Sequence, residues 1–332
     1  MKATIKDIAK MTGLSTATVS RVLAHKQGTY RQSTAKRVRE AADKLGYKRN
    51  VAAAELAAND VSTIAVIINN TETNFWLRVL DGIQAEANRQ GRQVMIFYAG
   101  NNDEKMLDQA INAAVERQTA AILLVSTKVN EQQLSVIEST RVPYRFISIY
   151  DSRTSHRPFI SSDNVEIGRM ATQYLLKRGH RKIGMVGIDK SSTGQERLLG
   201  YQEMMTKARL SIAPGWVQYG DYSLQSGKEL FSHIADLGLT AVIASSDMIG
   251  AGLMVSAQEA GVSVPDDLSI ISIDGTMICD VTNPQLTSVT QNFYQMGVQS
   301  VKDLVDSKNA ENHQFVPVEV KERASVRPLD VN

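Results

Sequence analysis

Short polar side chains recur directly after apolar runs along most of the chain, and this pattern favours the binding of a polyhydroxylated ligand. Carboxylates, amides and a guanidinium can satisfy pairs of hydroxyl groups, while aromatic faces stack on the C–H surface of a sugar ring. A cleft with this composition suits a sugar or a nucleoside. The candidate ligand-binding residues are Asn70, Phe75, Trp76, Asp151, Ser191, Thr193, Arg197, Tyr222, Ser246, Asp247, Asp274, Gln291 and Phe293.

Some of these residues also have a purely structural interpretation. An aspartate that follows a strand is as often a helix cap as a ligand contact, and this applies to Asp247. Arg197 could pair with a neighbouring carboxylate, and the aromatic residues Phe75, Trp76 and Phe293 could belong to a hydrophobic core. The sequence leaves both interpretations open at these positions.

The elements that would position these residues are apolar, β-branched runs that alternate with helical patterns. This alternation predicts parallel sheets covered by helices on both faces, and the chain is long enough for two such lobes. Ligands of such sheets bind beyond the carboxyl ends of the strands, where the polar candidates lie. The expected strands are 63–68, 93–98, 120–125, 146–149, 182–187, 241–244 and 268–273, and the expected helices are 75–91, 103–118, 164–179, 194–209, 223–238 and 247–261.

The N-terminal segment is basic, whereas the rest of the chain is acidic. Residues 1–60 contain twelve Lys or Arg and five Asp or Glu, a net charge of +7, so the remainder carries −5 of the overall +2. A basic head on an acidic body indicates that the head binds a polyanion.

The head also has the pattern of a helix-turn-helix. Thr4 and Asp7 have a spacing close to that of a capping box and precede one short helix, Gly13 breaks the pattern, and Ser15 is the expected cap of a second helix. A third helical run, 33–47, closes a small core. A three-helix module without a role in nucleic-acid binding would share this spacing.

The second of these helices has an outward face suited to a major groove. Thr16, Ala17, Ser20 and Arg21 are short or cationic, so the backbone can approach the bases while hydroxyls and a guanidinium reach base edges and phosphates. This helix is therefore the expected recognition helix.

Motifs along nearly the whole chain resemble the lactose/galactose repressor family of bacterial transcription regulators. They include TIKDIAKMTGLSTATVSRVL, AADKLGYKRN, SSDNVEIGRMATQYLLKRGHRKIGMVG, SVPDDLSIISID and NPQLTSVTQNF. The resemblance implies a helix-turn-helix domain over 1–49, a hinge helix or linker over 50–60, and a two-lobed domain over 61–332 like the periplasmic binding proteins. Its N-lobe would comprise about 61–161 and 292–320, and its C-lobe about 162–291 and 321–332.

The resemblance also implies site residues. Asp274, Arg197, Asp151, Asn70 and Phe293 would be the main contacts of the effector pocket. Leu56 matches the apolar wedge that enters the minor groove. The full expected DNA-binding set is Thr4, Ile5, Ser15, Thr16, Ala17, Thr18, Ser20, Arg21, Tyr47, Asn50, Ala53, Leu56 and Ala57.

Four positions depart from the family pattern. Arg49 stands where members usually have proline, and Val51 stands where they often have a basic residue. Ser246 and Gly275 stand where many have asparagine and a second aspartate. The identity of the effector therefore stays open.

The function implied by the resemblance is that of a repressor. It would bind a pseudo-palindromic operator in double-stranded DNA as a homodimer, under the control of a sugar or sugar phosphate. We expect a dimer because the chain ends at Asn332 without the leucine-rich helix of tetrameric members. The alternatives are a sugar-binding protein of transport or a sugar-modifying enzyme on the same α/β framework.

Several classes of site and location are disfavoured by the sequence. Gly250-Ala251-Gly252 lacks the third glycine of a dinucleotide fingerprint, because Val255 stands there, and one cysteine with five scattered histidines gives no metal-ligand spacing. We expect no catalytic residue, cofactor or metal. The chain has no run of roughly 18 apolar residues and no signal peptide, so we expect no membrane contact and a cytoplasmic location.

Overall fold

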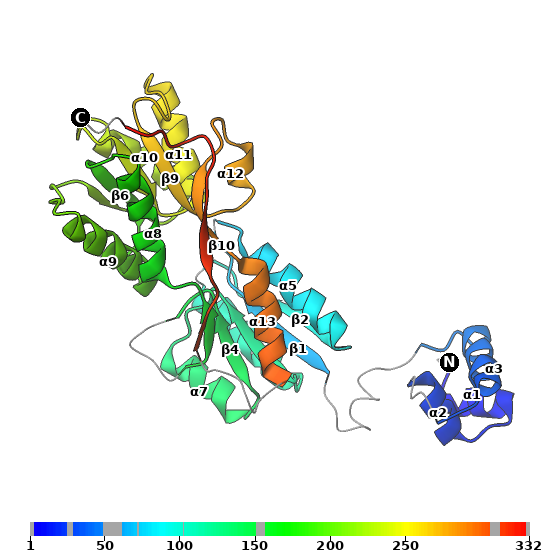
Figure 1. The fold of residues 1–332 in the computed structure, drawn as a ribbon. Coiled ribbons are helices and arrows are strands. Elements are labelled where there is room, and N and C mark those ends of the chain that lie inside the picture. Colours follow the sequence, from blue (N-terminus) through cyan, green and yellow to red (C-terminus); the bar gives the residue numbers. More distant parts are fainter. Residues whose placement is uncertain are drawn as a thin grey trace. The chain divides into compact units, whose positions relative to one another are not determined.

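The computed structural model describes residues 3–24, 29–48, 62–71, 73–101, 103–150, 157–305 and 313–329 (Figure 1). The chain divides into two compact units, Met1–Val61 and Ser62–Asn332, and each is described by itself. Five of the expected site residues lie outside the described residues: Asn50, Ala53, Leu56, Ala57 and Asp151. In the described part of the chain, no helix has the length and apolar character needed to cross a membrane.

The first unit contains three helices, α1 (Ile5–Thr12), α2 (Thr16–Leu23) and α3 (Gln32–Lys44). The expected capping box is present, with the Thr4 amide donating to Asp7 Oδ2 over 2.8 Å. Gly13 ends α1 with φ 65°, and the Ser15 side chain caps α2. The three helices enclose a small core, and its buried members are Ile8, Ala9, Val19, Val22, Ala35, Val38, Ala41 and Ala42.

The second unit begins with a first lobe built on a six-stranded parallel sheet. β1 lies inside the sheet, where Val66 is opposite Ile96 of one neighbouring strand and Leu123 of the other. In spatial order the strands are β11 (His313–Phe315), β5 (Phe159–Ser161), β4 (Tyr144–Ile147), β3 (Ala121–Val125), β1 (Thr63–Ile68) and β2 (Gln93–Tyr98).

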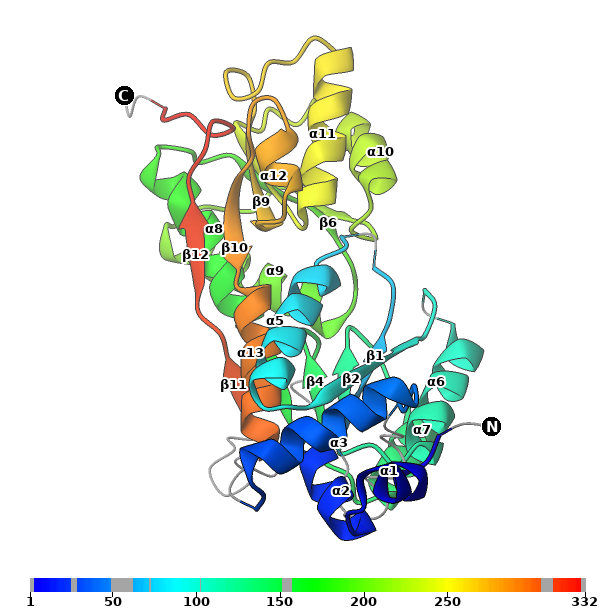
Figure 2. The same ribbon diagram turned by 90° about the vertical axis from the view of Figure 1, so that its right-hand side faces the viewer.

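Helices cover both faces of this sheet, which explains why every residue of β3, and every residue of β1 after Thr63, is apolar and buried. One face packs against α5 (Trp76–Arg89) and α13 (Phe293–Val305), which lie side by side (Figure 2). The other face packs against α6 (Glu104–Glu116) and α7 (Glu131–Ser139).

The second lobe repeats this arrangement with a closely similar strand order. Its last strand, β12, runs antiparallel to β10, and the other pairings are parallel. In spatial order the strands are β12 (Val318–Lys321), β10 (Thr287–Gln291), β9 (Ser269–Asp274), β8 (Ala241–Ala244), β6 (Ile183–Ile188) and β7 (Val217–Tyr219).

The helices of the second lobe also cover both faces of its sheet. α8 (Asn164–Lys177) and α9 (Ser192–Lys207) pack on one face, and α10 (Leu224–Ile234) and α11 (Asp247–Glu259) pack on the other. A short helix, α12 (Ile278–Val281), follows β9. The expected α/β architecture with two parallel-sheet lobes is thus confirmed.

The chain passes between the lobes after β5, after β10 and after β11. The last passage precedes Val318, earlier than the boundary near residue 320 that the sequence led us to expect. The reason is that Val320 already pairs with Val289 in the second sheet.

Two glycines let α8 and α9 cross with their backbones in contact. A Cβ added to Gly168 would lie 2.1 Å from the Arg197 carbonyl oxygen, and one added to Gly200 would lie 2.0 Å from that of Val165. Any larger side chain would push the helices apart. This close crossing fixes the position of α9 against α8, and with it the position from which the Arg197 side chain extends.

Candidate functional site

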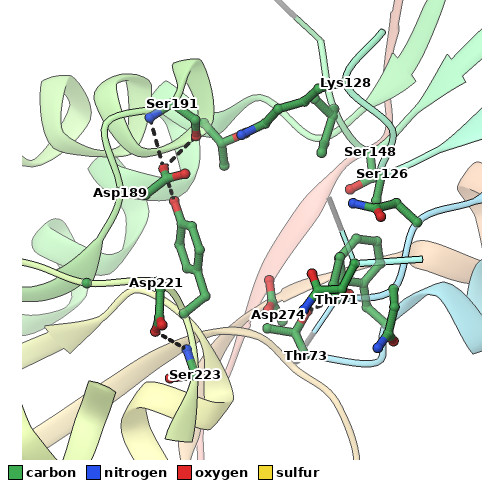
Figure 3. Close-up of a pocket in the computed structure, with 18 of the residues that line it drawn as sticks. Thr71, Thr73, Ser126, Lys128, Ser148, Asp189, Ser191, Asp221, Ser223 and Asp274 are labelled. Carbon is green, nitrogen blue, oxygen red and sulfur yellow. Dashed lines mark hydrogen bonds between the residues drawn. The ribbon is translucent and has the colours of Figure 1, made fainter. Parts of the chain in front are cut away.

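A cavity of about 730 Å³ lies between the two lobes, at the carboxyl ends of strands from both sheets. Figure 3 shows Asp189, Ser191 and Asp221 of the second lobe facing Thr71, Ser126 and Ser148 of the first. The volume falls in the range of small-molecule sites. Of the expected ligand-binding residues, the cavity is lined by Asn70, Phe75, Ser191, Thr193, Arg197, Tyr222, Asp274 and Gln291.

Arg197 is buried and rigidly held at the floor of this cavity. Its Nε donates to Asn164 Oδ1 over 3.0 Å, and its Nη1 donates to the Ser245 carbonyl oxygen over 2.7 Å. Nη2 lies 3.8 Å from Asp274 Oδ1. Because two of its groups are occupied by the protein, the guanidinium presents a fixed edge toward a ligand and toward Asp274.

Asp274 ends β9 with an unusual backbone, φ 115°, and its Oδ1 accepts a hydrogen bond from Gln291 Nε2 over 2.7 Å. Burial raises the pKa of this carboxyl to about 7, with Arg197 lowering the pKa and the Asp247 carboxylate raising it. Near neutral pH the Asp274 carboxyl can therefore accept a hydrogen bond from a ligand hydroxyl or donate one to it.

Asp247 does not line the cavity. Its carboxylate accepts hydrogen bonds from Ser272 Oγ at 2.6 Å and from the Thr276 amide at 2.6 Å, which ties α11 to the loop after β9. Burial raises the pKa of Asp247. These contacts favour the structural interpretation that the sequence left open for this residue.

Ser246 does not line the cavity either, but it holds the lining residue Tyr222 in place. Its side chain caps α11 at the Ile249 amide, and its Oγ donates to the Tyr222 carbonyl oxygen over 2.8 Å. Tyr222 is consequently held in place over the cavity, on backbone with φ 67°.

Phe293 and Trp76 support the cavity wall as members of the first-lobe core. Phe293 is buried and stacks on the lining residue Phe75, with ring centroids 4.5 Å apart. Trp76 packs against the same core cluster. Their contact with a ligand would be indirect.

Asp189 is a lining residue that sequence reasoning missed. It follows β6, and its Oδ1 accepts hydrogen bonds from the Tyr222 hydroxyl at 2.9 Å and from Ser191 Oγ at 2.5 Å (Figure 3). Its position after a strand was the signal that could have found it. Asp189 orients Tyr222 and Ser191 toward the cavity.

Ser126 and Ser148 were also missed, although they follow β3 and β4. Both have left-handed backbone, with φ 56° and 73°, as do Tyr222 and Asp274 in the same cavity. Ser126 is buried, and its hydroxyl has no partner among the described residues. Costly backbone conformations concentrate at functional sites, so their gathering here marks the cavity as one.

The exposed face of α2 forms a second candidate site. Thr16, Ala17, Ser20 and Arg21 are exposed, whereas Val19 and Val22 on the opposite face are buried. This helix is held by the small core and by its cap, so its outward face is available to a partner.

The other described members of the expected DNA-binding set flank α2. Thr4 and Ser15 are exposed at the starts of α1 and α2, and Ile5, Thr18 and Tyr47 are half-buried. Thr18 Oγ1 lies 2.9 Å from Ser15 Oγ. Among the residues described, no group of three or more His, Cys, Asp or Glu side chains could hold a metal ion.

Comparisons with known proteins assign both parts of the chain. Residues 4–50 match the family model described as bacterial regulatory proteins, lacI family, and residues 172–326 match the periplasmic binding protein-like domain. The crystal structure of a transcription regulator from Lactobacillus plantarum matches this chain with a TM-score of 0.72 and 40% sequence identity. The match covers 81% of this chain and 100% of that one. The chain belongs to the lacI family of bacterial regulatory proteins.

Two further comparisons cover nearly the whole length of the chain. The transcriptional repressor PurR of Actinobacillus pleuropneumoniae is 28% identical over 99% of both chains. The lac repressor dimer bound to operator and the anti-inducer ONPF has the same fold, with a TM-score of 0.87 over 98% of this chain and 100% of that one, at 23% identity. The lacI-family chain described here is accordingly a DNA-binding transcription regulator.

Proposed function

We propose that this regulator is a repressor that binds a pseudo-palindromic operator as a homodimer and responds to a sugar-like effector in the interlobe cavity. The observation that carries the proposal is the cavity itself, where Arg197 and Asp274 of one lobe face Ser126 and Ser148 of the other. A ligand that touches both lobes can shift the equilibrium between their arrangements, and this is the requirement for control of a distant DNA-binding head.

The composition of the cavity supports a polyhydroxylated effector. The fixed edge of Arg197 and the carboxyl of Asp274 can bind adjacent hydroxyl groups, and Phe75 offers an aromatic face. The expected contacts Asn70, Ser191, Thr193, Tyr222 and Gln291 line the same space.

The proposed operator contact is the exposed face of α2 in a major groove. Its short side chains let the backbone approach closely, and Arg21 adds a cation. Residues 50–60 would act as the hinge, with Leu56 as the wedge in the minor groove. Two half-sites require two heads, so the proposal includes a homodimer.

Exposed apolar side chains on both lobes support dimerisation through the second unit. Leu77, Ile96 and Tyr98 are exposed on the first lobe, and Met277 and Val281 on the second. The lac repressor structure of the same fold is also a dimer bound to operator.

DNA binding can be tested on the full chain with operator sequences selected from a randomised pool. The logarithm of the affinity should fall linearly with the logarithm of salt concentration, with a slope of about −0.9 per phosphate neutralised. Binding that does not respond to salt would contradict the assignment of the basic head.

The effector can be tested by a thermal-shift screen of mono- and disaccharides, sugar phosphates and purines. A compound that raises the melting temperature should also change operator affinity. If no compound on this panel does so, the proposed effector class is wrong. Product formation from any sugar on the panel would instead support the enzymatic alternative.

A further inference from the structure

A second, smaller chamber of about 240 Å³ adjoins the interlobe cavity. The two spaces share three lining residues, Lys128, Ile149 and Ser191. Lys128 points across the cleft toward Ser191 (Figure 3). A single ligand can therefore occupy both spaces by passing between these residues.

The chamber is walled mainly by aromatic and aliphatic side chains. Phe146, Tyr150 and Phe159 line it, and the rings of Tyr150 and Phe159 stack with centroids 4.4 Å apart and an interplanar angle of 12°. His313 stacks on Phe159 as well, with ring centroids 4.8 Å apart, so the rings left to contact the C–H surface of a ligand are those of Tyr150 and Phe146. No carboxylate belongs to its lining among the described residues.

Two polar atoms at the chamber lack a partner within the described protein. Thr127 is 2% exposed, and its hydroxyl makes no hydrogen bond. Arg157 Nε is also buried without a partner, although the same guanidinium is paired through Nη2 with Glu131. Buried polar atoms normally have partners, so these two atoms are available to hydrogen-bond a ligand that enters the chamber.

The chamber also adjoins direct contacts between the lobes. The Tyr150 hydroxyl donates to Glu196 Oε2 of α9 over 2.5 Å, and Ser192 Oγ donates to the Tyr150 carbonyl oxygen over 3.2 Å. Glu196 precedes Arg197 on the same helix. An occupant of the chamber would thus lie against the residues that join the two lobes.

We propose that the chamber holds the second ring of a two-ring effector, a disaccharide or glycoside whose first ring occupies the main cavity. The inference rests on the proposed function, since it assigns the effector class of the same site. A phosphate fits the chamber less well than a ring does. Arg157 is already paired with Glu131, Lys128 stands only at the opening, and most of the wall is apolar.

Isothermal titration of the full-length protein tests the inference with lactose, maltose, cellobiose and sucrose, with the monosaccharides glucose, galactose and fructose, and with glucose 6-phosphate. One disaccharide should bind at least about tenfold more tightly than both of its component sugars, since the second ring adds contacts of its own. A monosaccharide that binds as tightly as every disaccharide containing it would overturn the inference and leave the proposed function intact. Absence of binding by every sugar would overturn both.

Matched variants locate the second ring. Thr127→Val keeps the shape of the side chain and removes the unpaired hydroxyl, so it should weaken the disaccharide about 5- to 10-fold and leave the monosaccharide unchanged. Thr119→Val is the control, because Thr119 is also buried with an unpartnered hydroxyl but lines neither space. Equal effects of the two variants would refute the assignment.

Lys128→Met distinguishes a phosphate from a ring. If glucose 6-phosphate binds most tightly and Lys128→Met abolishes its binding, the chamber or its opening is an anion site and the two-ring inference is wrong. Under our inference, the disaccharide remains the tightest ligand of the wild-type protein.

Discussion

Replacing Gly168 with alanine should destabilise the second lobe and weaken effector binding together. The added Cβ would lie 2.1 Å from the Arg197 carbonyl oxygen and 3.1 Å from the Tyr201 amide nitrogen. Backbone atoms cannot move aside individually, so α9 must shift by about 1 Å to reach an ordinary contact. Overpacking of this kind costs about 1–3 kcal/mol, which outweighs the roughly 1 kcal/mol that alanine gains over glycine inside a helix.

The same shift carries Arg197 away from its partners. The bonds of 3.0 Å to Asn164 and 2.7 Å to Ser245 would lengthen beyond hydrogen-bonding range if the helix moved by about 1 Å. A hydrogen bond that involves a charged group is worth about 1.5–3 kcal/mol, so effector affinity should fall by about tenfold or more.

Urea unfolding gives the stability of the variant, and calorimetric titration gives its effector affinity. Gly250→Ala is the matched control, because Gly250 also lies inside a helix but its added Cβ would meet only side-chain atoms, Leu286 Cδ1 at 3.1 Å and Ser272 Cβ at 3.3 Å. The control should lose less stability than Gly168→Ala and keep the effector affinity of the wild type. A Gly168→Ala variant with unchanged stability and affinity would refute the reasoning.

Three further predictions concern single side chains. Arg21→Ala should weaken operator binding and leave the melting temperature and effector affinity unchanged, because Arg21 is exposed on α2; a parallel loss of effector binding would indicate unfolding instead. Burial lowers the pKa of His180 below 6.5, so the stability that the neutral imidazole contributes is complete above pH 6.5 and is lost as the pH falls. His180→Gln should therefore reduce the fall in the free energy of unfolding between pH 7.5 and pH 5.5. Burial raises the pKa of Asp274 from 3.8 to about 7, so stability is lost as the pH rises through this window. The melting temperature of Asp274→Asn minus that of the wild type should therefore increase as the pH rises from 5 to 8. A difference that stays constant over this range would contradict the raised pKa.

The long, buried strands and the capped helices were predictable from the sequence. β1, β6 and β9 are buried on both faces, so their composition alone identifies them. The short strands β5, β11 and β12 were not predicted, because they lack a run of apolar residues long enough to mark them and exist only through pairing with distant partners.

The sequence predicted where the candidate cavity lies, but it predicted only some of the residues that line it. Each residue after a strand could face the cavity or turn away from it, and the local pattern does not decide which. Asp274 faces inward on a left-handed backbone, whereas Asp247 turns toward Ser272. Ser126 and Ser148 also follow strands, but the left-handed backbone that turns them into the cavity depends on the assembled sheet and is not marked in the sequence.

The path of the chain between the lobes sets the order in which the protein can be completed during synthesis. The second lobe is nearly continuous from α8 to β10, whereas the first lobe lacks α13 and β11 until the chain returns to it. Until then, the sheet surface that Met296 and Val301 cover, around Ile64 and Val66, stays open to aggregation. The incomplete first lobe is therefore the stage of synthesis at which apolar sheet surface is exposed, and the interlobe cavity is assembled last.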